Sequence, residues 1–364
     1  MKRFGWILVL LMTASPTWAA KKMTVQQLKD LLGSLQRNHG TDVEVATRLK
    51  QIDLSEELTA AVKSDLLFAS PGPLTSEQIC VLDARSSMLA PPPSDQPNLP
   101  IPDSLTQKSI VDKAIDIATK NDQRISHLTA MKAVSRYGHL VTVSNWQNLD
   151  ATANLQSGDE SIMYLTSKYT ETVEIDQGIE KVSTSRVDPS LKRISPISEG
   201  GMRPAISQFL RQANDGGNIH WLRWETINGA RTAVFSFTID KRKAFYGIDY
   251  CCFPTLREVS GYDWKPFKKT VGLHGEFFID PDNGTMLRIV MQAEFNPTDF
   301  VEREDTRIDY GMVTIGDSTY LLPMGSYTHT EMDISGESKK AYINRRTFLV
   351  ASYAKYRMAG SAQR

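Results

Sequence analysis

The sequence predicts an α+β protein in which a helical N-terminal region precedes an antiparallel β-sheet that helices cover. Apolar residues recur with a helical period from about Met23 to about Tyr137, and the period then changes to two. A period near 3.6 is typical of a helix that buries one face, whereas a period of two is typical of a half-buried strand. The later segments are joined by short turns, which favours an antiparallel meander.

Capping boxes mark the expected helices of the N-terminal region. Such a box satisfies free backbone N–H groups of the first turn, and three residue pairs have its spacing: Thr24 with Gln27, Thr41 with Glu44, and Thr75 with Gln78. Apolar stripes with helical spacing accompany them: Val25, Leu28, Leu31, Leu32 and Leu35; Val43, Ala46, Leu49 and Ile52; Leu58, Val62 and Leu66. We interpret these stripes as core faces, with a groove for a partner protein as the alternative.

A proline-rich segment, residues 90–103, follows this region. Six of the twelve residues from Pro91 to Pro102 are proline, and proline cannot donate a backbone hydrogen bond to a helix or a central strand. The composition therefore predicts a stiff, exposed linker with polyproline character. A ligand for a proline-recognition domain is the alternative interpretation.

Further helices and strands are expected after the linker. Helices are predicted at Ser104 to Lys120, Asp122 to Arg136 and Met202 to Ala213, and their apolar faces can cover the sheet. Strands are predicted at His139 to Val143, Thr232 to Ile239, Gly272 to Asp280, Met286 to Phe295, Thr306 to Ile315, Ser318 to Met324, and Arg345 to Ser352, and one or two strands at Ser161 to Ile175.

The segment Asp280 to Gly284 predicts a hairpin turn, because Asn-Gly supplies positive φ angles. A calcium loop is the alternative, but the glycine falls one position early and the distal Glu is missing.

The first nineteen residues have the layout of a secretory signal peptide. Lys2 and Arg3 precede an apolar run from Phe4 to Thr13, and small residues stand before a cleavage point after Ala19. The run is about half the length that spans a bilayer, so a membrane anchor is disfavoured. We expect a periplasmic or secreted protein with no transmembrane segment in its mature chain. Its regions would be 1–19 signal peptide, 20–89 helices, 90–103 linker, 104–357 sheet with helices, and 358–364 tail.

Charge excludes a dedicated nucleic-acid binder. The 42 basic side chains equal the 42 acidic ones, and cleavage would leave a net charge of −2. Nucleic-acid binding is dominated by excess Lys and Arg. Three basic clusters, Lys241 to Lys243, Lys265 to Lys269 and Lys339 to Lys340, are expected in turns. We interpret them as solvated loop ends, with contact to anionic lipid headgroups as the alternative.

Motifs of common enzyme and metal sites are absent from the sequence. There is no Gly-x-Ser-x-Gly elbow, His-Glu-x-x-His, P-loop or Gly-x-Gly-x-x-Gly, so no cofactor is expected. His274 and Glu276 share one side of a predicted strand, where a solvent-facing pair is favoured over acid–base catalysis. Cys80, Cys251 and Cys252 leave an odd thiol, and a disulfide from Cys80 to one of the others stays open as an alternative.

A resemblance to a known family is carried by the C-terminal half. Gly200 to Ile239 joins a helix to a Trp-rich strand and a turn at Asn228-Gly229, and the segments Gly275 to Pro281, Leu287 to Ile289, Asp309 to Gly311 and Tyr320 to Pro323 follow. This succession resembles exported bacterial proteins similar to the periplasmic lipoprotein carriers, the LolA-like group. The resemblance covers roughly residues 200 to 350. It implies a curved, half-open barrel whose concave face receives acyl chains.

The expected function follows from this resemblance and from the apolar strand faces. We expect an exported, non-enzymatic protein that binds an apolar or lipidic ligand between sheet and helices. Its candidate ligand-binding residues are Phe235, Phe237, Leu287, Ile289, Met291, Phe295, Tyr320 and Leu322. Two alternatives stay open: an envelope interaction module whose N-terminal helices bind a protein partner, and a hydrolase with a dispersed site.

Overall fold

A computed structural model describes residues 21–138, 163–187, 198–201, 205–216, 218–244, 246–256, 262–333 and 344–358. The expected signal peptide, the expected strand His139 to Val143, and residues 359–364 of the expected tail lie outside the described residues. In the part that is described, no helix is long and apolar enough to cross a membrane.

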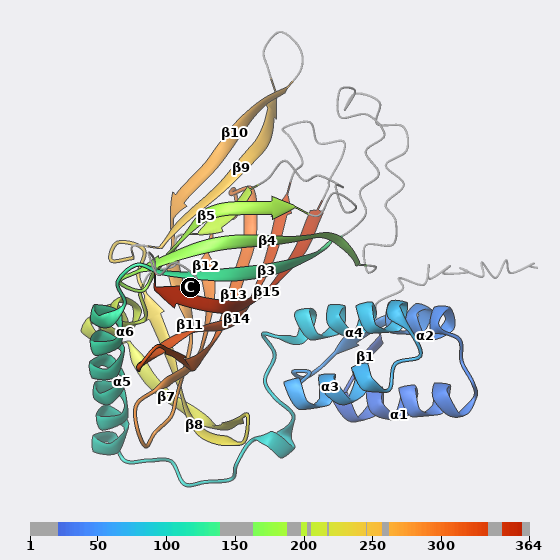
Figure 1. The fold of residues 1–364 in the computed structure, drawn as a ribbon, viewed down its shortest axis with the longest axis horizontal. Helices are drawn as coiled ribbons and strands as arrows, with labels where there is room; N and C mark the ends of the chain where they lie inside the picture. Colours follow the sequence, from blue (N-terminus) through green and yellow to red (C-terminus); the bar gives the residue numbers. More distant parts are fainter. Residues whose placement is uncertain are drawn as a thin grey trace, which may run out of the picture.

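The N-terminal unit consists of four helices and a two-stranded parallel sheet. The helices are α1 (Val25–Arg37), α2 (Asp42–Leu49), α3 (Ala60–Phe68) and α4 (Pro73–Ser86), and β1 (Lys21–Met23) pairs with β2 (Ile52–Leu54) (Figure 1). Apolar side chains from all four helices form a core of their own, with Leu28, Leu49, Ile79 and Leu82 almost fully buried. The expected stripes therefore serve as core faces, except that Val43 at the start of α2 is exposed.

Two of the three expected capping boxes are confirmed, and the third is wrong. Thr24 and Thr41 each accept from the backbone N–H three residues on. Thr75 instead lies inside α4, which begins at Pro73. The carboxylate of Asp42 in α2 accepts from the backbone N–H of Leu74 and Thr75, at 3.0 and 2.8 Å. A neighbouring helix thus supplies the cap, which local spacing does not reveal.

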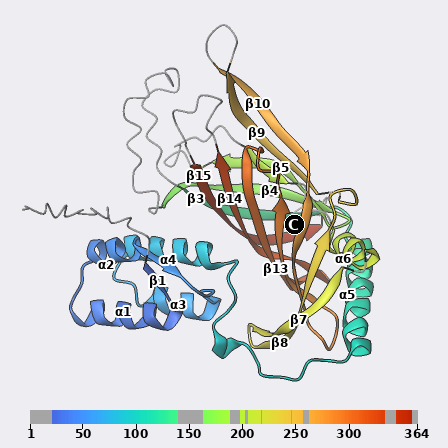
Figure 2. The same cartoon turned by 180° about the vertical axis from the view of Figure 1, so that it is seen from behind.

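A ten-stranded antiparallel sheet forms the body of the protein (Figures 1 and 2). Its spatial order is β5-β4-β3-β15-β14-β13-β12-β11-β8-β7. The sheet is curved and does not close, so β5 and β7 are its edges, and the predicted α+β class with a half-open sheet is confirmed. The strands are β3 (Leu128–Gly138), β4 (Tyr164–Asp176), β5 (Ile179–Val187), β7 (Ile219–Ile227), β8 (Ala230–Ile239), β11 (Gly272–Ile279), β12 (Met286–Glu294), β13 (Val301–Ile315), β14 (Ser318–Asp333) and β15 (Asn344–Met358).

Two helices cover part of one sheet face, which we name the inner face. They are α5 (Ser104–Arg124) and α6 (Ile206–Asp215), and they share one apolar cluster with β8, β11, β12 and β13. The predicted helix Asp122 to Arg136 is wrong, because α5 ends at Arg124 and most of that segment is β3. Strand β3 pairs with β4 and β15 along nearly its whole length, and this pairing on both sides overrides the local helical pattern.

A second, three-stranded sheet also faces the inner face. It consists of β6 (Ser198–Gly201), β9 (Gly247–Leu256) and β10 (Tyr262–Thr270), in the order β10-β9-β6. Tyr246, which precedes β9, and Ile248 and Tyr250 of β9 are buried in the cluster that α5 and α6 share. The basic residues Lys265 to Lys269 lie in β10, so their expected place in a turn is wrong.

The N-terminal unit contacts the opposite face of the large sheet, which we name the outer face. Val81 and Ala84 of α4 form an apolar cluster with Tyr137 of β3 and Phe348 of β15. After α4, the chain passes through a short 3-10 helix (Pro93–Asp95) and a largely exposed proline-rich segment to α5. Pro100 in this segment accepts a hydrogen bond from the indole N–H of Trp224 at 2.8 Å.

Candidate functional site

A cavity of about 670 Å³ lies between the inner face of the large sheet and strands β9 and β10. Helices α5 and α6 cover the β8–β13 part of the inner face, and the cavity occupies the neighbouring part. Its lining comes from six strands of the large sheet and from β9 and β10: Lys132, Val134, Tyr169, Glu171, Glu180, Tyr246, Gly247, Ile248, Asp249, Tyr250, Lys268, Lys269, Thr270, Glu304, Thr306, Ser326, Thr328, Leu349 and Ala351.

Glu304 is the most buried carboxylate of this lining. It lies on β13, its exposed fraction is 3%, and its Oε1 accepts a hydrogen bond from the hydroxyl of Tyr246 at 2.8 Å. The hydroxyl of Tyr250 donates to the other carboxylate oxygen. Hydroxyl donors of this kind are what a buried carboxylate needs in place of water. The two tyrosines thereby connect the small sheet to the large one.

A second polar group stands on β3, β4 and β5. The ammonium of Lys132 lies 2.8 Å from Glu180 and 3.7 Å from Glu171, and all three side chains are largely buried. The hydroxyl of Tyr353 donates to Glu180 at 2.8 Å, and the Lys132 ammonium lies 5.6 Å from the centre of the Tyr353 ring. Attraction between a cation and an aromatic ring adds to the ion pair.

The small sheet contributes the remaining charges of the cavity. Lys268 pairs with Asp249 at 2.7 Å, and both side chains are at least half exposed. Lys269 pairs with Asp299 outside the cavity, and both of these side chains are largely buried. Each of these two lysines therefore already has a carboxylate partner, and the basic cluster does not make the cavity basic.

The eight ligand-binding residues predicted from the sequence lie elsewhere. Phe235, Phe237, Ile289 and Met291 are buried in the cluster under α5 and α6, and Phe295 packs against it. Tyr320 and Leu322 belong to a separate cluster with Ile125 and Leu128. None of the eight is among the described lining residues of the cavity. Ligand binding by them stays a prediction.

Leu287 does not take the place that alternation gives it. The pairing of β11 with β12 shifts at this point, so that Phe278 lies opposite Arg288 and Ile279 lies opposite Met286. Met286 therefore enters the buried cluster, whereas Leu287 is only partly buried. A β-bulge changes which side chains share a face.

Sequence reasoning missed the residues of β9 that line the cavity. No strand was expected between Ile239 and Gly272, although Tyr246, Ile248 and Tyr250 alternate with smaller or charged residues. This period of two is the signal that indicates a strand with one apolar face. The polar residues Glu304 and Thr306 were missed because a buried polar side chain has no apolar pattern to mark it.

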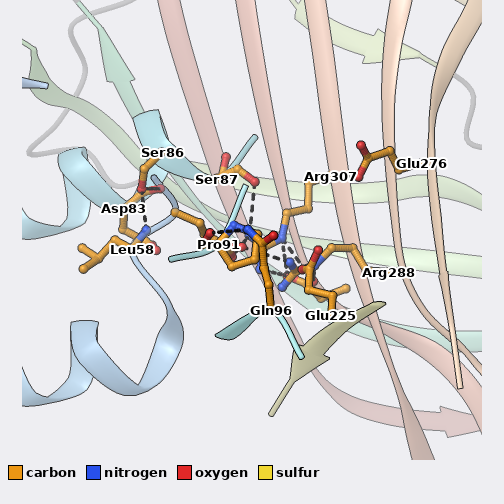
Figure 3. Close-up of polar contacts among 12 residues, drawn as sticks. Leu58, Asp83, Ser86, Ser87, Pro91, Gln96, Glu225, Glu276, Arg288 and Arg307 are labelled. Atoms are coloured by element: carbon orange, nitrogen blue, oxygen red, sulfur yellow. Dashed lines mark hydrogen bonds and ion pairs between the residues drawn. The ribbon is translucent and has the colours of Figure 1, made fainter. Parts of the chain in front are cut away.

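A second pocket of about 430 Å³ lies on the outer face, beside the contact with the N-terminal unit. Figure 3 shows Arg288 and Arg307 of the sheet pointing toward the segment that follows α4. Arg288 lies 3.2 Å from Glu57 of the N-terminal unit and 2.6 Å from Asp309 of β13. Glu225 also lines this pocket, and its burial raises its pKa despite the pairing with Arg223 at 2.8 Å.

His274 and Glu276 share the outer face, as predicted, but they contact different partners. The ring of His274 lies 2.9 Å from Gln292 and 3.3 Å from Glu294, whereas Glu276 accepts two hydrogen bonds from Arg223. This geometry occupies Glu276 with an ion pair and does not join the two side chains into an acid–base pair.

The described residues support neither a reactive cysteine nor a metal site. Cys80 is a free thiol, and burial raises its pKa, which keeps it protonated and unreactive. The side chains of Cys251 and Cys252 lie outside what the structure describes. Among the described side chains, no group of three His, Cys, Asp or Glu is arranged to hold a metal ion.

Neither a protein-family model nor a curated protein sequence matches the chain. Three solved structures are similar to 70% of it, each at 10% sequence identity. They are a LolA superfamily protein from Nitrosomonas europaea (TM-score 0.25, 94% of that chain), a putative outer membrane lipoprotein-sorting protein domain from Vibrio parahaemolyticus (0.23, 95%) and a DUF1329 family protein from Desulfovibrio piger (0.24, 95%). The first of these is a protein of the group that the sequence resemblance names.

Proposed function

We propose that the protein is an exported, non-enzymatic binding protein that holds an amphipathic, lipidic ligand in the inner-face cavity. The observation that carries this proposal is the cavity itself. Its volume of about 670 Å³ lies within the range of roughly 300 to 1,000 Å³ that small-molecule sites occupy. Export is supported by the signal-peptide layout of the first nineteen residues.

The lining of the cavity supports an amphipathic ligand. Val134, Ile248, Leu349 and Ala351 offer apolar walls on which an alkyl chain would gain about 0.8 kcal/mol for each buried methylene. Hydroxyls, lysines and carboxylates line the same space. A ligand with an apolar and a polar end suits both kinds of surface, whereas a purely apolar one would displace water from the polar groups and offer them no hydrogen bond in return.

Binding, as opposed to catalysis, is supported by how the polar residues are engaged. Lys132 is paired with Glu180, and Glu304 accepts from Tyr246 and Tyr250. A nucleophile held next to a base within hydrogen-bond reach would be the mark of covalent catalysis. The arrangement that the cavity shows is one of fixed pairs, which position a ligand and hold the walls together.

Native mass spectrometry on protein purified from its own host, with solvent extraction of the bound material, tests this proposal. We expect a mass above that of the mature chain, released on denaturation as an amphipathic molecule. Ala351→Phe places a ring in the cavity and should abolish the added mass. Ser352→Phe, on the exposed side of the same strand, is the matched control and should retain it. A ligand kept by the Ala351 variant, or none in the wild type, contradicts the proposal.

A further inference from the structure

We propose that the outer-face pocket is a second binding site, and that its ligand is a neutral saccharide. The pocket has a volume of about 430 Å³ and lies between the segment that follows α4 and strands β7, β8, β11 and β12. This volume falls within the range that small-molecule sites occupy. The pocket and the inner-face cavity lie on opposite faces of the large sheet, so this inference does not depend on the ligand proposed for that cavity.

Arg288 presents a buried hydrogen-bond donor to this pocket. Its side chain is 9% exposed, its Nε donates to Asp309 at 2.6 Å, and its Nη1 donates to Glu57 at 3.2 Å. Among the described residues, no hydrogen bond or ion pair uses its Nη2, which carries two N–H groups. An oxygen atom of a ligand in the pocket can therefore accept from Arg288.

Glu225 presents a buried acceptor in the same pocket. Its side chain is 2% exposed, and its Oε2 accepts two hydrogen bonds from Arg223, at 3.0 and 2.8 Å, whereas its Oε1 accepts none from a described residue. Burial raises the pKa of Glu225, although the charges of Arg223 and Arg288 act against this effect (Figure 3). A buried carboxylate is stabilised by each further donor. A ligand that donates to Glu225 and accepts from Arg288 therefore fits both groups.

Four more polar side chains of the pocket can each donate and accept hydrogen bonds. They are the hydroxyl, imidazole and amide groups of Ser236, Thr238, His274 and Gln292. A saccharide hydroxyl has the same double capacity, so a ring with several hydroxyls matches such a set. Leu222 and Leu89, which are 44% and 37% exposed, add apolar surface on which the C–H face of a sugar ring can pack.

Charge disfavours an ionic ligand in this pocket. An anion would meet the carboxylates of Glu57, Glu225 and Glu276, and a cation would meet the guanidinium groups of Arg223 and Arg288. An extended peptide is also disfavoured, because peptides that add to a sheet are held by backbone groups of an edge strand. Three of the four strands that line the pocket, β8, β11 and β12, are paired on both sides, so recognition there depends on side chains.

Titrations followed by saturation-transfer difference NMR on the mature chain test the inference. Maltose, cellobiose and N,N′-diacetylchitobiose are the neutral probes, digalacturonate is the anionic probe, and a trialanine peptide with blocked ends is the peptide probe. We expect at least one neutral disaccharide to bind about tenfold or more tightly than digalacturonate and the peptide. Binding of no neutral disaccharide, or tighter binding of either other probe, would overturn the saccharide assignment.

Variants then locate the site. Thr238→Phe places a ring at an exposed position of the pocket and should weaken the bound disaccharide about tenfold or more. Thr314→Phe, at an exposed position of β13 outside the pocket, is the matched control and should bind as the wild type does. Glu225→Gln should also weaken binding, because a neutral amide is a poorer acceptor than a carboxylate.

Ala351→Phe, which fills the inner-face cavity, separates the two sites and should leave saccharide binding unchanged. A Thr238 variant that binds as tightly as the wild type, or an Ala351 variant that loses the saccharide, would refute the outer-face site. Because the inner-face ligand is followed by its own mass, loss of either site leaves the test of the other intact.

Discussion

Arg307 is the side chain on which the contact between the N-terminal unit and the sheet is centred. It is 7% exposed, it donates to Glu57 and to the carbonyl of Ser87, and it lies 3.0 Å from Asp309 (Figure 3). Burial alone would lower the pKa of Arg307, but the charges of Asp309 and Glu57 raise it overall. Such a buried group depends on its partners, because each of them has given up water.

Replacing Arg307 with methionine should lower the free energy of unfolding by about 3–5 kcal/mol, since Glu57 and Asp309 would each lose one of the two arginines that pair with them among the described residues. Urea denaturation measures the loss. Arg242→Met is the control, because Arg242 is exposed and pairs with Asp240, which lies two residues away and is half exposed. A loss below about 1 kcal/mol for the Arg307 variant would show that the buried network adds little to stability.

Glu331 on the outer face leads to a prediction of how the stability of the protein changes at acid pH. The interaction with His329, whose Nε2 lies 3.1 Å away, and the charge of Arg346 lower the pKa of Glu331 from 4.5 to about 2, against the effect of burial. A lowered pKa in the folded state stabilises the protein above pH 4.5, and this contribution is lost as the pH falls toward 2.

Glu331→Gln should therefore be less stable than the wild type at pH 6, and the difference should shrink steadily between pH 4.5 and pH 2. Urea denaturation of both proteins across this range gives the difference directly, so that other carboxylates cancel. A difference that stays constant with pH would mean that the ionised carboxylate is not what stabilises the fold here.

At the scale of elements, Gly275 shows how closely two strands approach. A Cβ at this position of β11 would lie 2.0 Å from the carbonyl oxygen of Val290 and 2.8 Å from the Cα of Met291, both in β12. Backbone atoms cannot move aside without breaking the pairing of the two strands. The glycine is thus required by the packing of the sheet.

Gly275→Ala should cost at least about 2 kcal/mol of unfolding free energy, because the added methyl overpacks the backbone. Gly247→Ala is the matched control: it also changes a strand glycine, but its Cβ would meet nothing within 4 Å. Thermal unfolding of the two variants compares them. Equal melting temperatures would show that β11 and β12 separate more easily than their pairing indicates.

The elements differ in how far the sequence reveals them. Strands β8 and β11 to β15 have one apolar face, so the period of two predicts them, although several run longer than expected. Strand β3 was expected as a helix, since its pairing partners β4 and β15 are distant in the sequence. The residues of the candidate site are harder to predict from the sequence than the strands are. Its polar residues come from strands far apart in the chain, and only the curvature of the sheet brings them to one cavity.

At the scale of the whole molecule, the large sheet separates two different surfaces. The inner face combines the packed cluster under α5 and α6 with the cavity beneath β9 and β10. The outer face carries rows of charged side chains that bind the N-terminal unit through Glu57 and through Asp83, which accepts from Tyr327 at 3.1 Å. Because these contacts are buried and charged, the two units depend on each other for the solvation of their charges.

We therefore expect the N-terminal unit and the sheet to unfold together. Residues 21–102 contain no tryptophan, so tryptophan fluorescence reports on the rest of the chain, whereas far-UV circular dichroism reports mainly on the helices. The two signals should follow one transition in urea, as cooperative unfolding requires.

Glu57→Ala removes the carboxylate shared by Arg288 and Arg307, and the helical signal should then be lost at lower urea than the fluorescence signal. Asp65→Ala, an exposed change in α3, should leave the transitions coincident. Two separate transitions in the wild type would show that the outer-face contact does not couple the units.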